Sequence, residues 1–78
     1  KHGTGTRIEG PSKGRAVIVD DVATTGRSNV ESIKILTDAG ADVLMVLVVV
    51  DREEGATENL SPFDLEYKSL ISISDLVN

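Results

Sequence analysis

Asp20 and Asp21 are adjacent carboxylates that directly follow an apolar run and precede a short loop of glycine and hydroxyl-bearing residues. Carboxylates accept strong, charge-assisted hydrogen bonds, and the hydroxyls of a sugar diol are suitable donors. They can also bind Mg²⁺, directly or through water. The ordinary structural alternative is a solvated strand end, where acidic pairs are common. The pair by itself therefore leaves a binding role and a structural role open.

The loop after the carboxylates has the chemistry of an anion-binding turn. Thr24, Thr25 and Ser28 carry hydroxyl donors, and Gly26 lets the backbone approach a ligand closely. A helix that begins here would add unpaired N–H groups and a dipole that favours phosphate. The Gly-Lys-Ser/Thr of a Walker loop is absent, and a plain strand-to-helix connection explains the same residues. The two carboxylates would repel a phosphate in the loop unless a sugar diol or a cation lay between them. The acidic pair and the loop together therefore favour a ligand that carries both a sugar diol and a phosphate.

The elements around this stretch are predicted to be strand, helix, strand. Strands are expected over residues 15–20, in which residues 17–19 are continuously apolar, and over residues 43–50, which are apolar throughout. Continuous apolar strands are typical of a parallel sheet covered on both faces. The connection between them is then a right-handed crossover. A shorter strand is expected over residues 65–70, whereas residues 51–61 are polar and irregular. In such sheets ligands bind at the carboxyl ends of the strands, where the carboxylates and the loop fall.

The helix is predicted from its cap and its apolar face. Ser28 and Glu31 fit a capping box, with Ser28 as the N-cap. Gly40 suits the end of the helix, and Ser74 is expected to cap a further helix near the C-terminus. The apolar face recurs every three residues, with Ile35 beside it, and consists of Val30, Ile33 and Leu36.

One helix covers only one face of a sheet whose strands are apolar on both faces, so a second layer is needed. The 78 residues contain no such layer. We therefore expect either extensive dimerisation or a piece of a longer protein, and we favour the second. A chain of this size, without disulfides or a structural metal, has marginal stability by itself.

Composition narrows the function classes. The chain has 13 acidic and 8 basic residues and a net charge of -5, which argues against a nucleic-acid backbone as the partner. Its longest apolar run is far shorter than the roughly 20 residues that cross a bilayer. There is no cysteine, no signal-peptide pattern, and a single histidine, His2, which cannot form a metal site alone. A cytoplasmic protein that binds neither nucleic acid nor membrane is expected.

Residues 17–28 resemble the phosphoribosyl-pyrophosphate motif of the type I phosphoribosyltransferases. The resemblance implies an α/β, Rossmann-like fold, of which this chain holds a part with a parallel βαβ core and a short C-terminal strand. It implies that Asp20 and Asp21 bind and position the ribose hydroxyls during catalysis. The 5′-phosphate is then bound by Thr24, Thr25, Gly26, Arg27 and Ser28.

Three further segments resemble the C-terminal portion of the orotate phosphoribosyltransferases within that family. Residues 1–5 resemble the end of the mobile catalytic loop, in which His2 would act, with Lys1 as a neighbour of the loop lysines. Residues 48–56 resemble the next strand end, and the resemblance of residues 65–78 is loose.

Arg52 would bind orotate, because a guanidinium fork pairs with a carboxylate at two points. The resemblance also places Thr24 against the orotate ring. The alternative for Arg52 is a salt bridge within its own loop, with Asp51, Glu53 or Glu54.

The implied reaction transfers the phosphoribosyl group from phosphoribosyl pyrophosphate to orotate, giving orotidine 5′-monophosphate and pyrophosphate in pyrimidine biosynthesis. Mg²⁺ would be held through the substrate near the two aspartates, without a direct protein ligand. A homodimer is implied, with the mobile loop reaching the neighbouring site. The alternatives are a phosphoribosyltransferase for another base and a non-catalytic sensor of phosphoribosyl pyrophosphate.

The 78 residues would form one partial domain that is inactive alone. Residues 1–14 would be the remnant of the catalytic loop, residues 15–51 the βαβ core with the ribose-5-phosphate motif, and residues 52–78 the base-contact loop and tail.

Overall fold

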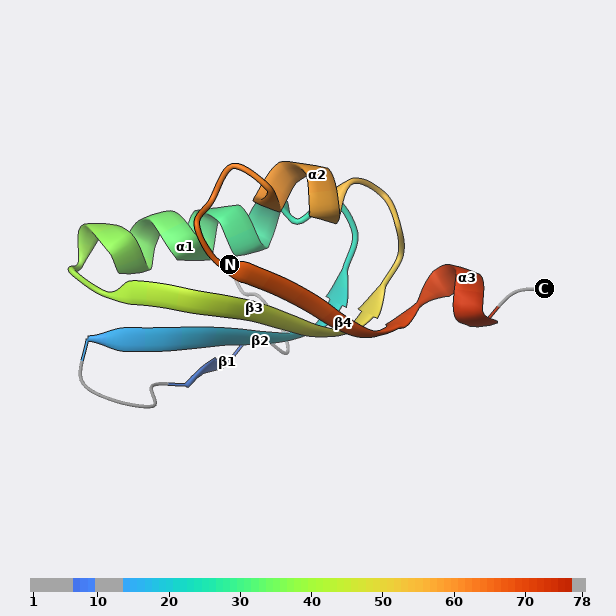
Figure 1. Ribbon diagram of the computed structural model, residues 1–78, viewed down its shortest axis with the longest axis horizontal. Helices are drawn as coiled ribbons and strands as arrows, with labels where there is room; N and C mark the ends of the chain where they lie inside the picture. The colour runs from blue at the N-terminus through green and yellow to red at the C-terminus, as the bar shows by residue number, and fades with distance from the viewer. Residues whose placement is uncertain (1–6, 10–13, 77–78) are drawn as a thin grey trace.

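A strand-helix-strand crossover forms the centre of the computed structural model, which describes residues 7–9 and 14–76. Strand β2 (Arg15–Ala23) leads into helix α1 (Arg27–Asp38), and strand β3 (Asp42–Asp51) returns parallel to β2 (Figure 1). The predicted parallel crossover is therefore confirmed.

The sheet has four strands in the order β1-β2-β3-β4. Strand β4 (Glu66–Ser72) pairs parallel with β3 and confirms the short strand expected over residues 65–70. Strand β1 (Arg7–Glu9) pairs antiparallel with β2 and was not predicted. A strand of three residues carries too little periodicity to be recognised from the sequence.

Strand β2 is longer than predicted, because its pairing with β3 continues past the carboxylates. Val22 pairs with Val50 and Ala23 with Asp51, so the strand ends at Ala23 rather than at Asp20. Backbone pairing does not depend on side-chain polarity, and β3 supplies a partner along this whole length. The two carboxylates consequently lie within the strand, near its carboxyl end.

Helix α1 begins one residue before the predicted cap. Gly26 is the N-cap residue, with φ 82°, and no side-chain hydrogen bond caps the described helix. Val30 N donates to Gly26 O at 2.9 Å. The capping box at Ser28 is therefore wrong, because the left-handed conformation that glycine allows turns the chain earlier. Gly40, with φ 95°, follows the helix end as expected.

Helix α2 (Ala56–Leu60) corrects the expectation that residues 51–61 are irregular. It begins after Gly55, and it buries its first and last residues. Five residues with two apolar positions are too few for a periodic signal in the sequence.

Helix α3 (Ile73–Leu76) begins before the expected cap. Ser72 N donates to Asp75 Oδ2 at 3.0 Å, whereas Ser74 Oγ donates to Glu53 Oε2 at 2.7 Å. The prediction of Ser74 as the cap is therefore wrong. None of the helices in the described part of the chain is long and apolar enough to cross a membrane.

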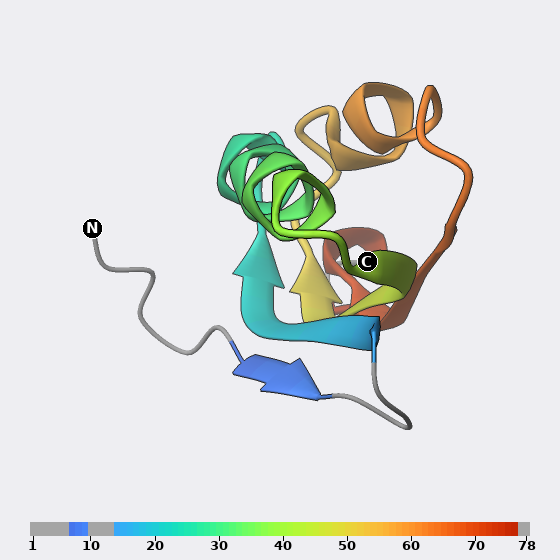
Figure 2. The same ribbon diagram turned by 90° about the vertical axis from the view of Figure 1, so that its left-hand side faces the viewer.

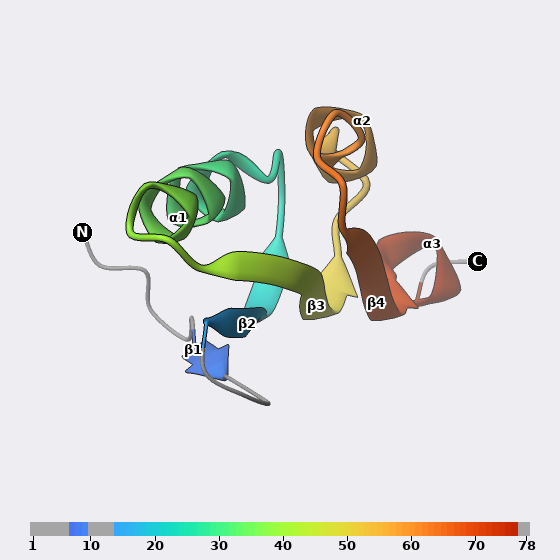
Figure 3. The same ribbon diagram turned by 60° about the vertical axis from the view of Figure 1, so that its left-hand side comes forward.

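Both α1 and α2 lie on one face of the sheet (Figures 2 and 3). Ile33 of α1 is buried, Val30 and Leu36 pack partly against the core, and Ile35 is 69% exposed. The predicted helix face is therefore confirmed for Val30, Ile33 and Leu36 but not for Ile35, which was expected beside them. The core under the helices is formed by Ile18, Ala23, Ile33, Val43, Val46, Val48, Ala56 and Leu60.

No helix within residues 14–76 covers the opposite face of the sheet (Figure 3). Strand alternation places half-buried or exposed apolar side chains there. We call this surface the open face, and it comprises Val17, Val19, Met45, Leu47, Val49 and Leu70. Within the described residues, the expected second layer is missing.

Candidate active site

The carboxyl ends of β2 and β3 lie side by side and bring together two segments that are far apart in the sequence (Figure 1). Ala23 pairs with Asp51, and Arg52 N donates to Ala23 O at 2.9 Å. The loop after β2 and the turn after β3 therefore leave the sheet from the same edge, as the sequence predicts for a ligand site.

Asp20 is a buried carboxylate that connects β2 to α1. Only 6% of the residue is exposed. Its Oδ1 accepts from Asp21 N at 2.8 Å, and its Oδ2 accepts from Asn29 Nδ2 at 3.3 Å. An ionised carboxylate has about four acceptor positions, so these two bonds leave capacity for a ligand.

Asn29, whose residue is 1% exposed, was not predicted as part of the site. It lies one helical turn before Ile33, on the apolar face of α1 that packs on the sheet. A polar side chain on an otherwise apolar helix face was the signal available in the sequence, because buried polar groups are normally hydrogen-bonded.

Asp21 is exposed, unlike its neighbour. Alternation along a strand directs consecutive side chains to opposite faces, so Asp20 faces the helices and Asp21 does not. The two carboxylates are adjacent along the chain, but the structure gives them different surroundings. Asp20 is held by the protein, while Asp21 is open to solvent.

Helix α2 contacts the loop between β2 and α1 and stabilises it. Asn59 Nδ2 donates to Thr25 O at 2.7 Å. Gly26 is buried, and a Cβ at this position would lie 3.2 Å from Ala56 Cα. Thr24, the first residue of the loop, is exposed. Asn59 gave no signal in the sequence, because its role depends on a short helix that periodicity does not reveal.

The first turn of α1 presents backbone donors at the loop. Arg27 N donates to Thr25 Oγ1 at 3.3 Å, a long bond, and the first α-helical hydrogen bond is made by Val30 N. The N–H groups of Ser28 and Asn29 precede that bond and have no partner within the helix. The side chains of Arg27 and Ser28 are exposed beside them. This end of α1 is suited to bind an anion.

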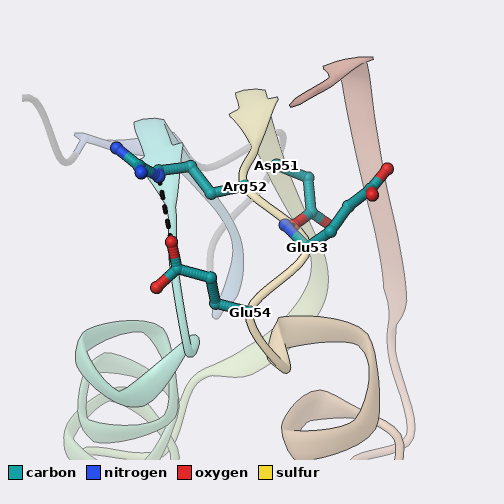
Figure 4. Close-up of polar contacts among 4 residues, drawn as sticks. All are labelled: Asp51, Arg52, Glu53 and Glu54. Carbon is teal, nitrogen blue, oxygen red and sulfur yellow. Dashed lines mark hydrogen bonds and ion pairs between the residues drawn. The ribbon is translucent and has the colours of Figure 1, made fainter. Parts of the chain in front are cut away.

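Arg52 forms a salt bridge with Glu54 in the turn after β3 (Figure 4). Its Nε lies 3.0 Å from Glu54 Oε2, and the two side chains are 54% and 46% exposed. The salt-bridge alternative for Arg52 is thus present in the structure. Exposed pairs of this kind contribute about 0–1 kcal/mol, so a carboxylate ligand can displace Glu54.

Asp51, the last residue of β3, is a second buried carboxylate, with 6% of the residue exposed. Its Oδ1 accepts from Glu53 N at 2.7 Å, and its Oδ2 accepts from Tyr67 Oη at 2.9 Å. Burial, followed by the hydrogen bond to Asp51 and its negative charge, raises the pKa of Tyr67 above its ordinary value. Tyr67 therefore remains a hydrogen-bond donor above the pH at which a free phenol loses its proton.

His2 and Lys1 lie outside the described residues. Within the described segments, no group of three or more histidine, aspartate or glutamate side chains is arranged to hold a metal ion. The site described above consists of the β2 carboxylates, the loop with the α1 N-terminus, and the Arg52 turn.

Comparison with protein-family models found none that matches the chain. The orotate phosphoribosyltransferase of Natronomonas pharaonis is 48% identical over an alignment of 79 residues, gaps included, that covers 99% of this chain and 46% of that protein. The crystal structure of orotate phosphoribosyltransferase from Aeropyrum pernix superimposes with a TM-score of 0.79 at 45% identity, over 86% of this chain and 40% of that one.

The orotate phosphoribosyltransferase of Mycobacterium tuberculosis, in complex with 5-phospho-α-D-ribosyl 1-diphosphate, gives a TM-score of 0.74 at 37% identity. That match covers 80% of this chain and 38% of the other. The chain thus spans less than half the length of the relatives it matches. Sequence and fold together identify it as a portion of a type I phosphoribosyltransferase of the orotate phosphoribosyltransferase family.

Proposed function

We propose that the protein containing this chain transfers the 5-phosphoribosyl group from phosphoribosyl pyrophosphate to orotate, giving orotidine 5′-monophosphate and pyrophosphate. The observation that carries the proposal is the shared edge of β2 and β3, where carboxylates, an uncapped helix N-terminus and an arginine meet. The ligand of the Mycobacterium tuberculosis relative supports the same donor substrate here.

The ribose-5-phosphate half of the donor is assigned to β2 and the loop that follows it. Asp21 is exposed and Asp20 retains free acceptor positions, so both can accept hydrogen bonds from the ribose hydroxyls. The 5′-phosphate would be bound by backbone and side-chain donors of Thr24, Thr25, Gly26, Arg27 and Ser28. The contacts of α2 with Thr25 and Gly26 would keep these donors in place before the ligand binds.

The acceptor base is assigned to the turn after β3. The exposed guanidinium of Arg52 would exchange Glu54 for the carboxylate of orotate, with a two-point geometry that lysine cannot reproduce. The exposed Thr24, which follows the end of the neighbouring strand β2, would lie against the orotate ring.

The chain's own residues contribute chiefly by positioning. With the ribose held by Asp20 and Asp21 and the phosphate by the loop, the anomeric carbon is fixed relative to the base. The bond between the anomeric carbon and pyrophosphate would break first, pyrophosphate would leave, and the base nitrogen would then attack the anomeric carbon. Mg²⁺ would supply neutralisation of the developing charge on pyrophosphate. The exposed Asp21 carboxylate is a hard oxygen donor that fits a water-mediated contact with this ion.

A homodimer completes the proposal, with His2 and Lys1 in a loop that closes over the neighbouring subunit's pyrophosphate. Because phosphoribosyl pyrophosphate and orotate are charged and do not cross membranes unaided, the proposed location of the reaction is the cytoplasm.

The experiment is steady-state kinetics of the full-length protein with Arg52→Ala and Arg52→Lys. Losing charge-assisted hydrogen bonds to the orotate carboxylate should raise the KM for orotate on the order of 10- to 100-fold. The KM for phosphoribosyl pyrophosphate should stay within about 2-fold, and Arg52→Lys should recover only part of the loss. Lys34→Ala, which removes an exposed cation from α1, away from the open face, is the matched control.

An unchanged KM for orotate in Arg52→Ala would remove the support for orotate as the acceptor. Turnover with another base but not with orotate would favour a different phosphoribosyltransferase. Binding of phosphoribosyl pyrophosphate without turnover of any base would favour a sensor.

A further inference from the structure

Asp51 joins three parts of the structure that meet beside Arg52. It is the last residue of β3, its Oδ1 accepts from Glu53 N at 2.7 Å, and its Oδ2 accepts from Tyr67 Oη at 2.9 Å. Tyr67 belongs to β4, the neighbouring strand. A hydrogen-bonded path therefore runs from β4 through a buried carboxylate to the backbone on the far side of Arg52.

The turn that follows β3 needs such support. Glu53 has φ 61°, in the left-handed region that residues other than glycine rarely adopt. Such a conformation persists only where the surroundings hold it. Asp51 holds the Glu53 N–H, and Ser74 Oγ donates to the Glu53 side chain at 2.7 Å. The backbone geometry around Arg52 thus depends on contacts of its neighbours.

The side chains of the turn divide between two sides of the backbone (Figure 4). Arg52 and Glu54 extend on one side, while Asp51 and Glu53 lie on the other. Within the described residues, the only ion pair of the Arg52 side chain is the exposed salt bridge with Glu54, and its backbone N–H donates to Ala23 O at 2.9 Å. Its direction is consequently set by the backbone, which is held at Arg52 by Ala23 O and at Glu53 by Asp51.

We propose that Tyr67 and Asp51 are positioning residues for Arg52: the Tyr67 hydroxyl orients the Asp51 carboxylate, which fixes the Glu53 N–H and thereby the turn that presents Arg52 to the acceptor base. The proposal rests on the proposed function of Arg52 as the group that binds the base. It assigns a role in acceptor affinity to a tyrosine of β4, outside the turn that is proposed to bind the base.

The experiment compares Tyr67→Phe with the parent in the full-length protein, because this change removes the hydroxyl and keeps the ring. The KM for orotate should rise on the order of 10-fold, as expected for one hydrogen bond to a charged group. The KM for phosphoribosyl pyrophosphate should stay within about 2-fold. Ser69→Ala is the matched control, since it removes a hydroxyl from the same strand that makes none of the described bonds to Asp51.

Asp51→Asn and Asp51→Ala provide a second, independent measurement. The asparagine amide oxygen can still accept from Glu53 N, so Asp51→Asn should raise the orotate KM less than Asp51→Ala does. Adding Tyr67→Phe to Asp51→Ala should have no further effect, because the path is already broken.

Arg52→Ala separates this inference from the function on which it rests. If Arg52→Ala leaves the orotate KM unchanged, the function of Arg52 is wrong. If Arg52→Ala raises it but Tyr67→Phe does not, the positioning role alone is wrong. An equal rise of both KM values in Tyr67→Phe would also overturn the proposal, because it would indicate a general structural effect.

Discussion

Asp20 and Asn29 form a buried polar contact between strand β2 and helix α1. Their side chains are hydrogen-bonded at 3.3 Å, and both residues are almost fully buried. If one partner is removed, the other remains buried without either a hydrogen bond or contact with water, and this is destabilising. The contact is therefore a matter of stability as well as of site geometry.

Asn29→Ala is expected to lower the free energy of unfolding by about 1–3 kcal/mol, because Asp20 Oδ2 loses its buried donor. Ser28→Ala, at the preceding and exposed position, should change it by less than about 0.5 kcal/mol. Urea unfolding of the full-length protein without ligands measures both. A cost of about 1 kcal/mol or more for Ser28→Ala would instead restore Ser28 as the helix cap.

The raised pKa of Tyr67 predicts a loss of stability at alkaline pH. In the unfolded chain the phenol titrates near its ordinary value of 10.0, whereas the folded protein keeps the proton to higher pH. The contribution is fully present below pH 10 and declines as the pH rises above it, because only the unfolded state then releases its proton.

Unfolding experiments at about pH 9 and about pH 11 should therefore find a steeper decline for the parent than for Tyr67→Phe. Asp51→Asn should make the decline in stability between these pH values shallower than in the parent, since it removes the negative charge beside the phenol. Equal slopes for parent and Tyr67→Phe would contradict the raised pKa.

The sequence alone predicts the positions of the motif residues but not their surroundings. Asp20, Asp21 and the loop are placed at a strand end by the apolar run before them. That Asp20 is buried and Asp21 exposed depends on how far β2 continues its pairing with β3. Asp51 and Tyr67 meet only because β4 lies beside β3, which no local pattern contains.

At the scale of elements, α2 connects the two halves of the site. It begins directly after the Arg52 turn, and it contacts the loop after β2 through Ala56 and Asn59. The strands β2 and β3 could be predicted from their continuous apolar runs, and the face of α1 from the regular spacing of its apolar residues. Helix α2 could not, because its five residues are stabilised by contacts distant in the sequence.

Gly26→Ala tests the contact between the loop and α2. Both Gly26 and Gly14 have φ 82°, so alanine is strained equally at either position. Only at Gly26 would the new Cβ meet a helix backbone, 3.2 Å from Ala56 Cα, while at Gly14 it meets nothing within 4 Å. The free energy of unfolding should fall by about 1–3 kcal/mol more for Gly26→Ala than for Gly14→Ala.

Chemical denaturation of the two variants in the full-length protein gives this difference directly. Isothermal titration with phosphoribosyl pyrophosphate and Mg²⁺ should also find weaker binding only for Gly26→Ala, because the loop must move away from α2. Equal losses of stability in both variants would mean that the contact with Ala56 contributes nothing.

At the scale of the molecule, the open face is the largest departure from a complete two-sided sheet. The helices α1 and α2 cover one face, and the apolar side chains of β2, β3 and β4 on the other face remain half-buried or exposed. Contiguous exposed apolar surface of this kind promotes association. The catalytic parts proposed for His2 and the neighbouring subunit also lie outside this region.

The isolated 78-residue chain is therefore expected to self-associate and to have no measurable orotate turnover. Leu70→Lys places a charge on the open face and should reduce the self-association, which sedimentation velocity measures. Ile35→Lys is a matched control, because Leu70 is 67% and Ile35 69% exposed, and Ile35 lies on α1 away from the open face. Since the two changes add the same charge at the same exposure, only the surface that they alter differs. Equal effects of the two substitutions would show that net charge controls association, and turnover by the monomeric chain would show that it needs no second layer.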